Sequence, residues 1–424
     1  MMRTIITASA ALALALPAAA QAPVQPPRTV EGQLAGGAHW KALVPANFNG
    51  RLLVWSHGYS PRIDPPEPAP AQYRDLLLQR GYALIASDYG AGGWSLEQAV
   101  PAQRAAVEAF AAREGRPARV LAWGSSMGGL ISTALAEQDK PAIDGALAMC
   151  PSIGGAVGMM NMGLDGAFAF TTLVAANSGL SLVNVSDDMA NGRKAQTALD
   201  AARTTREGRA RLALAGVLGG IPGWTRVDRA EPAAADYEAQ LDEMAATFVM
   251  GTFMPRNDQE ARAGGVFSWN IGVDYARQLA LSGRRAMVEA LYAKAGLSLS
   301  EDLAALAKAP RIAAKPAAVR YMMANYTPNA KPRVPLVSLQ AVGDGMTSPS
   351  LQRAYVQTAP AAMVQGLWHN GAGHCRLPAA QVLAAIDHLE ARIDSGKWAA
   401  RPPQFVDHTP APMLRPCMRG GKCR

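Results

Sequence analysis

The sequence predicts an α/β fold: a mostly parallel sheet with helices on both faces, interrupted by a large helical cap. Two observations support this prediction. Short apolar segments alternate with helical patterns over 28–149 and again over 334–395, and such alternation is typical of a parallel sheet covered on both faces. The intervening residues 154–330 contain several helical patterns but no comparable strand. We therefore expect these residues to form a cap that is inserted after the sixth strand.

The first sheet region begins with two strands that Gly36 and Gly37 join as an antiparallel hairpin. The following strands are predicted from short apolar runs, and the helices from apolar residues at helical spacing. The expected strands are Thr29–Leu34, His39–Val44, Leu52–Trp55, Tyr82–Ser87, Val120–Trp123 and Ile143–Met149, and the expected helices are Gln72–Arg80, Leu96–Arg113 and Leu130–Ala136. The five prolines of 61–70 exclude a helix or a central strand, so this segment is expected to be a surface loop.

The cap is expected to be helical throughout, with Gly154–Gly158 as the hinge that leads into it. Its helical patterns are Ala190–Ala201, Thr205–Ala215, Ala234–Phe248, Tyr275–Ala293 and Ser300–Lys308. Its many methionines are either ordinary core residues or the lining of an adaptable apolar surface.

The sheet pattern resumes after the cap and ends in a long amphipathic helix. We expect strands at Val334–Leu339 and Ala362–Leu367, helices at Leu351–Thr358 and Ala379–Ser395, and a loop at 369–376. The predicted organisation is a signal peptide (1–20), a first core part (21–155), the cap (156–330), a second core part (331–398) and an irregular tail (399–424).

The composition excludes several classes of protein. A chain of 424 residues with 49% hydrophobic residues can bury a large core and is not a disordered protein. The net charge of +8 comes from scattered Lys and Arg with few aromatic neighbours, so nucleic-acid binding is not expected. The sequence leaves the oligomeric state open.

The N-terminus has the pattern of a secretory signal peptide. Arg3 precedes an apolar run from Ile5 to Leu16, and Ala18–Ala20 offers a small-residue cleavage site. The run is shorter than the ~20 residues that span a bilayer, and no other stretch approaches that length. We therefore expect an exported protein, periplasmic or extracellular, without a membrane span.

Four cysteines make disulfides plausible in an exported chain. Cys417 and Cys423 lie close together in the tail, and Cys150 and Cys375 could pair across the fold. Three pairings are possible, and the sequence does not choose among them. A zinc site is not expected, because no pair of cysteines has the C-x2-C spacing with histidines downstream.

A candidate nucleophile lies at the centre of the first sheet region. Gly124, Ser126 and Gly128 have G-x-S-x-G spacing between an expected strand and an expected helix. A serine at such a strand–turn–helix apex is strained and exposed, and the flanking glycines allow the sharp turn.

A serine nucleophile needs a base, and the base needs an orienting acid. Among six histidines, His374 is favoured because the glycines of 371–373 let the backbone project its side chain over the strand ends, with His369 as the alternative. Asp344 follows an expected strand and is the candidate acid; alternatively it caps its own turn. The chain order is then Ser126, Asp344, His374.

The candidate oxyanion hole consists of two backbone N–H groups. One belongs to Met127, which follows the nucleophile, and the other to Tyr59, in the loop after Leu52–Trp55. His57 is expected to shape this loop and not to titrate.

These segments together resemble the signatures of the α/β-hydrolase superfamily. The matching residues are Ser56–Tyr59, Gly124–Gly129, Gly343–Gly345 and Gly373–His374, and the resemblance covers about 28–155 and 332–398. It implies a Ser-Asp-His triad and an acyl-enzyme intermediate, with a cap after the sixth strand. Cys375 beside the base resembles exported members that tie this loop down by a disulfide. Members with a cysteine before the nucleophile differ from this chain, which has Ser125 there.

The resulting hypothesis is an exported serine hydrolase that cleaves small carboxylic esters with a moderately apolar or aromatic acyl part. One alternative is an exopeptidase or amidase of the same superfamily acting on amides or short peptides, and another is a binding protein on a hydrolase scaffold. No P-loop, H-E-x-x-H or EF-hand pattern occurs, so no cofactor or metal is expected. The substrate-binding residues are left unassigned.

Overall fold

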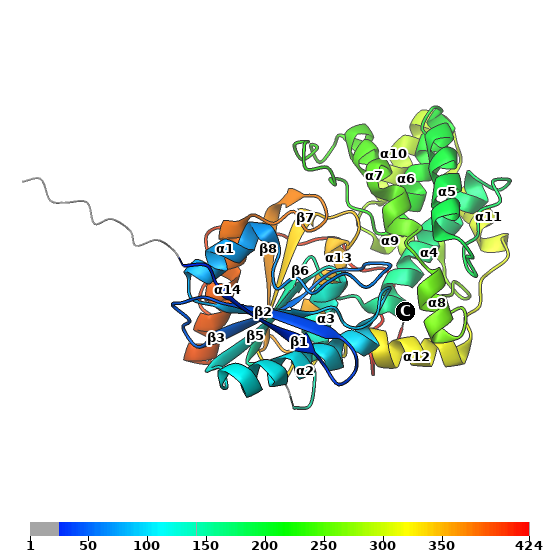
Figure 1. Cartoon of the computed structure of the whole chain (residues 1–424). Helices are drawn as coiled ribbons and strands as arrows, with labels where there is room; N and C mark the ends of the chain where they lie inside the picture. The colour runs from blue at the N-terminus through cyan, green and yellow to red at the C-terminus, as the bar shows by residue number, and fades with distance from the viewer. Residues whose placement is uncertain (1–24, 141, 424) are drawn as a thin grey trace, which may run out of the picture.

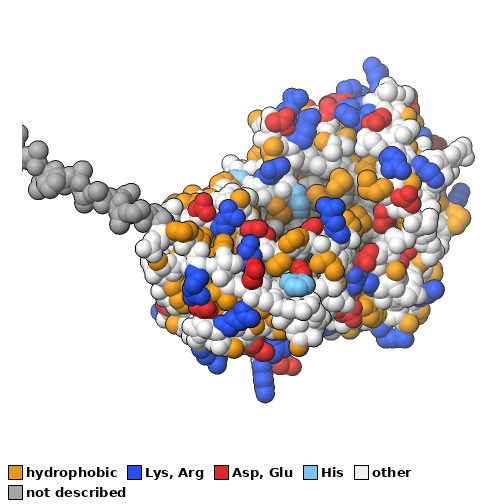
Figure 2. All heavy atoms as spheres, in the orientation of Figure 1, with side chains coloured by type: hydrophobic (Ala, Val, Ile, Leu, Met, Phe, Trp, Pro, Cys, Tyr) orange, Lys and Arg blue, Asp and Glu red, His pale blue; other side chains and the backbone are white. Residues whose placement is uncertain are grey.

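The computed structural model describes residues 25–140 and 142–423. The expected signal peptide at 1–20 lies outside the described residues. Figure 1 shows a sheet core and, beside it, a block of helices from the middle of the chain. We call residues 155–326 the helical block. Figure 2 shows a hollow surface where the two parts meet, with acidic and basic side chains interspersed on the visible face.

The core contains an eight-stranded sheet of order β1-β2-β4-β3-β5-β6-β7-β8. Its strands are β1 (Arg28–Gln33), β2 (His39–Val44), β3 (Arg51–Ser56), β4 (Ala83–Ser87), β5 (Arg119–Ser125), β6 (Gly145–Met149), β7 (Leu336–Gly343) and β8 (Val364–Ala372). β2 is antiparallel to β1 and to β4, and the other pairs are parallel. The predicted mostly parallel sheet is therefore confirmed, including the antiparallel first hairpin.

Helices cover both faces of the sheet (Figure 1). They are α1 (Ala71–Gln79), α2 (Leu96–Glu114), α3 (Met127–Ala136), α13 (Pro349–Thr358) and α14 (Ala379–Ser395). Successive residues of a strand point to opposite faces, so in β3 Leu53 packs in the cluster containing α1 and α14, whereas Leu52 packs in the cluster containing α2 and α3. Because the central strands are buried on both faces, they are continuous apolar runs in the sequence.

Several element boundaries differ from the prediction, and two of these differences change the interpretation of a segment. β8 continues to Ala372, so His369 lies in the strand and pairs with Ala341, whereas the sequence analysis placed it in a loop. The expected helix Tyr275–Ala293 is two helices, interrupted at Gly283, whose positive φ of 71° ends the first. Both errors come from tertiary pairing or backbone conformation that apolar spacing does not reveal.

The helical block contains three helices that periodicity did not predict: α4, α8 and α12. Its helices are α4 (Gly155–Leu173), α5 (Asp188–Ala202), α6 (Arg206–Leu218), α7 (Tyr237–Thr252), α8 (Asn257–Ala263), α9 (Tyr275–Leu281), α10 (Arg285–Ala295), α11 (Leu299–Lys308) and α12 (Pro316–Tyr326). The expected hinge Gly154–Gly158 falls at the start of α4. This helix is buried on all sides from Gly155 to Phe170. A helix with no exposed face has no amphipathic stripe to detect.

Small residues let α4 and α6 pack closely. A Cβ added at Gly166 would lie 2.8 Å from the Cα of Gly219 and 2.9 Å from the carbonyl oxygen of Ala215. Side chains at these positions would separate the two helices. None of the helices in the described ranges combines the length and apolar character needed to cross a bilayer.

The C-terminal tail contributes a buried charge to the helical block. The Arg415 guanidinium is 1% exposed and bonds through Nη1 to Asp165 Oδ2 at 2.8 Å. Tyr275 donates its hydroxyl hydrogen to Asp165 Oδ1 at 3.1 Å. Burial raises the pKa of Asp165 to about 6, although Arg415 opposes the shift. The tail is thereby joined to α4 by a compensated ion pair.

We expect Arg415→Met to lower the free energy of unfolding by about 3 kcal/mol, because it leaves Asp165 buried without its cation. Urea denaturation measures this change. Arg333→Met is the matched control: Arg333 pairs with Asp139 at 3.2 Å on the surface, with side chains 60% and 92% exposed. Its loss should change stability by no more than about 0.5 kcal/mol. Equal effects of the two variants would contradict the structural role of the buried pair.

Candidate active site

Ser126 lies at the turn between β5 and α3, as predicted. Its backbone has φ 58° and ψ −120°, a strained conformation for a residue with a side chain. The neighbouring glycines make the turn possible by removing side-chain bulk. A Cβ at Gly128 would lie 1.9 Å from the carbonyl oxygen of Ser56, and one at Gly124 would lie 2.3 Å from that of Gly128. Glycine is therefore needed at both positions of the G-x-S-x-G motif, because backbone segments pack directly against each other at this turn.

The structure brings Ser126, His374 and Asp344 together at the carboxyl ends of three strands. His374 Nε2 lies 3.0 Å from Ser126 Oγ, and His374 Nδ1 lies 2.8 Å from Asp344 Oδ2. Because Asp344 follows β7 and His374 follows β8, residues far apart in sequence reach one edge of the sheet. The geometry allows the imidazole to accept the serine proton while the carboxylate orients the ring.

Asp344 also organises its own loop, as the alternative interpretation of this residue predicted. Its Oδ1 accepts hydrogen bonds from the N–H groups of Met346 at 2.9 Å and Thr347 at 3.0 Å. The Thr347 hydroxyl lies 2.9 Å from Oδ2. Asp344 is fully buried, and these donors satisfy a carboxylate that would otherwise be costly to bury. Thr347 was not among the predicted site residues; a polar residue three positions after a turn aspartate is the signal that could have identified it.

A disulfide holds the loop of the candidate base. Cys150, directly after β6, is bonded to Cys375, which follows His374. Cys417 and Cys423 form the second disulfide, within the tail. Both pairs are among those left open by the sequence. Among the described residues, one group of three possible metal ligands lies together, namely Cys150, His374 and Cys375. Since both sulfurs are in the disulfide, neither is a thiolate available to a metal.

The loop after β3 lies against the candidate nucleophile. A Cβ at Gly58 would lie 3.4 Å from Ser126 Cβ and 4.0 Å from its Oγ, so Tyr59 follows a backbone segment in close contact with Ser126. Met127 begins α3, and the first N–H groups of a helix have no intrahelical acceptor. Both predicted oxyanion donors therefore belong to segments that touch Ser126.

His57 is packed into this loop. Its ring stacks on Tyr89 at 4.1 Å between centroids, and its Nδ1 lies 2.7 Å from the carbonyl oxygen of Gly58. Since a carbonyl only accepts, Nδ1 carries the hydrogen. Burial lowers the pKa of His57, which favours the neutral ring. These contacts fit a residue that shapes the loop.

The alternative base, His369, lies elsewhere. It is part of β8, and its Nδ1 is buried without a hydrogen-bond partner among the described residues. Burial lowers the pKa of His369, with Gln381 opposing the shift. The side chain that hydrogen-bonds to Ser126 Oγ is that of His374.

The chain resembles known proteins in sequence and in structure. The chain is 27% identical over 414 residues to an o-phthalyl amidase of Xanthobacter agilis, covering 89% of each protein. No protein-family model matches the chain. Solved structures that resemble it include an esterase of Pyrococcus furiosus (13% identity, 88% of this chain and 92% of that one, TM-score 0.39). A proline iminopeptidase of Mycobacterium smegmatis is another (14% identity, 87% and 100%, TM-score 0.41).

The strand order, the antiparallel β2 and the strand–turn–helix around Ser126 define the fold of this chain. The chain has the α/β-hydrolase fold. The resemblance seen in the sequence is thus confirmed at the level of the fold.

We expect Gly128→Ala to destabilise the protein by about 3 kcal/mol or more, because its methyl group would overlap the Ser56 carbonyl. Gly36→Ala is the control, since a Cβ there meets nothing within 4 Å, and its effect should stay within about 0.5 kcal/mol. Chemical denaturation of both variants measures the difference. A fully stable Gly128→Ala variant would show that the turn is not packed as described.

The two disulfides should differ in their contribution to stability. Cys150 and Cys375 are 225 residues apart, whereas Cys417 and Cys423 are 6 apart. Loop-closure entropy then assigns about 5 kcal/mol to the first and about 2 kcal/mol to the second. We expect the double variant C150A/C375A to lose about twice as much unfolding free energy as C417A/C423A. The opposite order would contradict this assignment.

Proposed function

We propose that this chain is a serine hydrolase that cleaves small carboxylic amides and esters through an acyl-enzyme. The observation that carries this proposal is the hydrogen-bonded series from Ser126 Oγ to His374 Nε2 and from His374 Nδ1 to Asp344 Oδ2. Ser126 is the proposed nucleophile, His374 the base and Asp344 the residue that orients the imidazole.

In the proposed reaction, His374 takes the proton of the Ser126 hydroxyl as Oγ forms a bond to the substrate carbonyl carbon. The N–H groups of Met127 and Tyr59 stabilise the resulting oxyanion. Protonated His374 then gives its proton to the leaving amine or alkoxide, which departs and leaves an acyl group on Ser126. A water molecule, deprotonated by His374, attacks this acyl group and releases the carboxylic acid.

The sequence pattern and the sequence relative favour different bonds as the one that is cleaved. The sequence pattern led to an ester hypothesis, whereas the relative that matches along 89% of this chain is an o-phthalyl amidase. We therefore propose amides of aromatic carboxylic acids as the first substrates to test, with esters of the same acids beside them. Esters present a better leaving group to the same triad, so activity on both is expected.

We further propose that the protein is exported and that the helical block forms the cap of its active site. The apolar run after Arg3, followed by Ala18–Ala20, supports export. The two disulfides are compatible with an oxidising compartment. The position of the block between β6 and β7 supports its assignment as a cap.

The test is hydrolysis of a benzoyl anilide and of the matching p-nitrophenyl ester by Ser126→Ala and Ser125→Ala variants. Ser126→Ala should lose about 10⁴-fold or more in kcat with its melting temperature retained, because the nucleophile is absent. Ser125→Ala is the matched control from the same turn and should stay within a few-fold of the parent. Both Ser125→Ala and the parent should react with a fluorophosphonate probe. Turnover or labelling retained in Ser126→Ala would refute the proposed nucleophile.

A further inference from the structure

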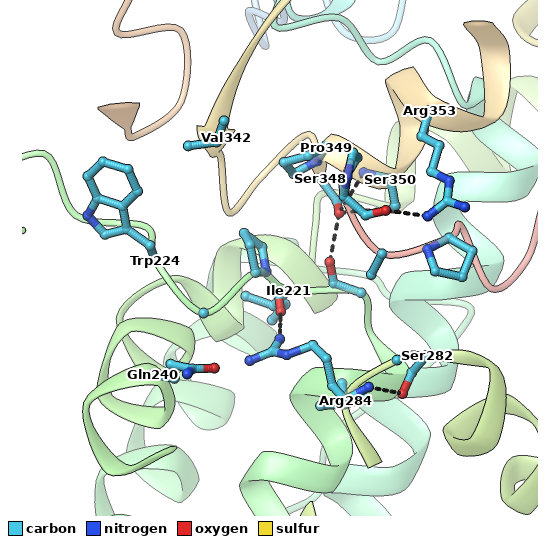
Figure 3. A pocket seen from close by; sticks show the side chains of 18 of the residues that line it. Ile221, Trp224, Gln240, Ser282, Arg284, Val342, Ser348, Pro349, Ser350 and Arg353 are labelled. Atoms are coloured by element: carbon cyan, nitrogen blue, oxygen red, sulfur yellow. Dashed lines mark hydrogen bonds between the residues drawn. The ribbon is translucent and has the colours of Figure 1, made fainter. Parts of the chain in front are cut away.

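A cavity of about 790 Å³ lies between the helical block, the start of α13 and the C-terminal tail. Ser126, His374, Met127 and Tyr59 do not line it, so it is separate from the proposed reaction centre. Its size is within the range of small-molecule sites, roughly 300–1,000 Å³. Figure 3 shows Arg284 and Gln240 of the helical block on one side of it, Ser348 and Arg353 on the other, and Trp224 at its edge.

Arg284 brings an uncompensated positive charge to this cavity. Its Nη1 donates to the carbonyl oxygen of Ile221 at 2.6 Å, drawn in Figure 3, and its Nη2 lies 3.2 Å from the sulfur atoms of Met244 and Met287. Thioether sulfur is a weak acceptor. Among the described ion pairs, none includes Arg284. Burial lowers the pKa of Arg284 to about 10, and no carboxylate opposes the shift.

A second guanidinium lines the same cavity. Arg353, on α13, donates through Nη1 to the carbonyl oxygen of Pro410, and its Nε is buried without a partner among the described residues. The lining contains one carboxylate, that of Glu231, which is exposed. Two arginines thus face one glutamate, and the cavity has an excess of positive charge.

The remaining walls suit a neutral, partly apolar group. Trp224, Val342, Leu414 and several prolines line them, with Gln240 and Ser348 as polar neighbours. Arg284 differs from Arg415, whose fully buried charge is balanced by Asp165: Arg284 is half-buried, and no ion pair among the described residues includes it. Partial burial removes water from the cation, and a guanidinium fork pairs well with a carboxylate.

We propose that this cavity binds a small organic carboxylate, with the carboxylate on Arg284 and the apolar part against Trp224. The site is independent of the proposed hydrolysis but adjoins its machinery. Ser348, in the lining, follows Thr347, which bonds to Asp344. The carbonyl oxygen of Trp224 would lie 2.8 Å from a Cβ at Gly343, the residue before Asp344.

The test is isothermal titration of the full-length protein carrying Ser126→Ala, which cannot hydrolyse the amides by the proposed reaction, with benzoate and hexanoate, each compared with its neutral amide. At least one acid should bind saturably, and at least tenfold more tightly than its amide. Arg284→Gln should weaken that binding at least tenfold, because it removes the charge. Arg285→Gln is the matched control: Arg285 is the next residue, lies outside the lining and pairs with Glu289 at 2.7 Å on the surface. It should bind as the parent does.

Trp224→Ala provides a second variant that leaves both arginines in place, and it should weaken the binding several-fold. It also decides the matter if Arg284→Gln does not fold. The proposal is overturned if neither acid binds, if acid and amide bind equally, or if sulfate binds as tightly as the acids. Binding that Arg284→Gln and Trp224→Ala both leave unchanged would also overturn it, since the ligand would then lie elsewhere.

Discussion

The close approach of the β5–α3 turn to β3 is the constraint on which the rest of the candidate site depends. The Ser56 carbonyl occupies the space that a side chain at Gly128 would need. This contact fixes the backbone of Ser126 in its strained conformation, and it sets the adjoining Gly58 loop against the serine side chain. Parallel strands then carry Asp344 and His374 to the same edge.

Asp344 and the Cys150–Cys375 disulfide hold His374, which lies on a loop, in one orientation. The carboxylate is fully buried and engages two backbone N–H groups, the Thr347 hydroxyl and the His374 ring. The disulfide joins the residue after His374 to the end of β6. A base on an otherwise irregular segment is thereby tied to two strands of the sheet. Preorganisation of this kind removes the cost of orienting the ring during a reaction.

Two arginine side chains at the helical block differ in how their charges are balanced. Arg415 from the tail is balanced by Asp165 on α4, whereas Arg284 faces sulfur atoms, a backbone carbonyl and a cavity. The first arrangement supports the packing of the tail. The second arrangement is the basis of the carboxylate site that we propose, and it lies beside the loop of the candidate acid.

The sequence by itself determined the alternation of strands and helices, the turn at Ser126, the order of Ser126, Asp344 and His374, and the segments that carry the proposed oxyanion donors. These are local signals: apolar period, glycine spacing and polar residues at strand ends. Tertiary structure alone decided that α4 is a helix buried all round, that His369 belongs to β8, which cysteines pair and that Arg284 forms no ion pair within the described part of the chain. Each of these depends on which residues meet across the fold, and neither periodicity nor spacing encodes distances between segments far apart in the chain.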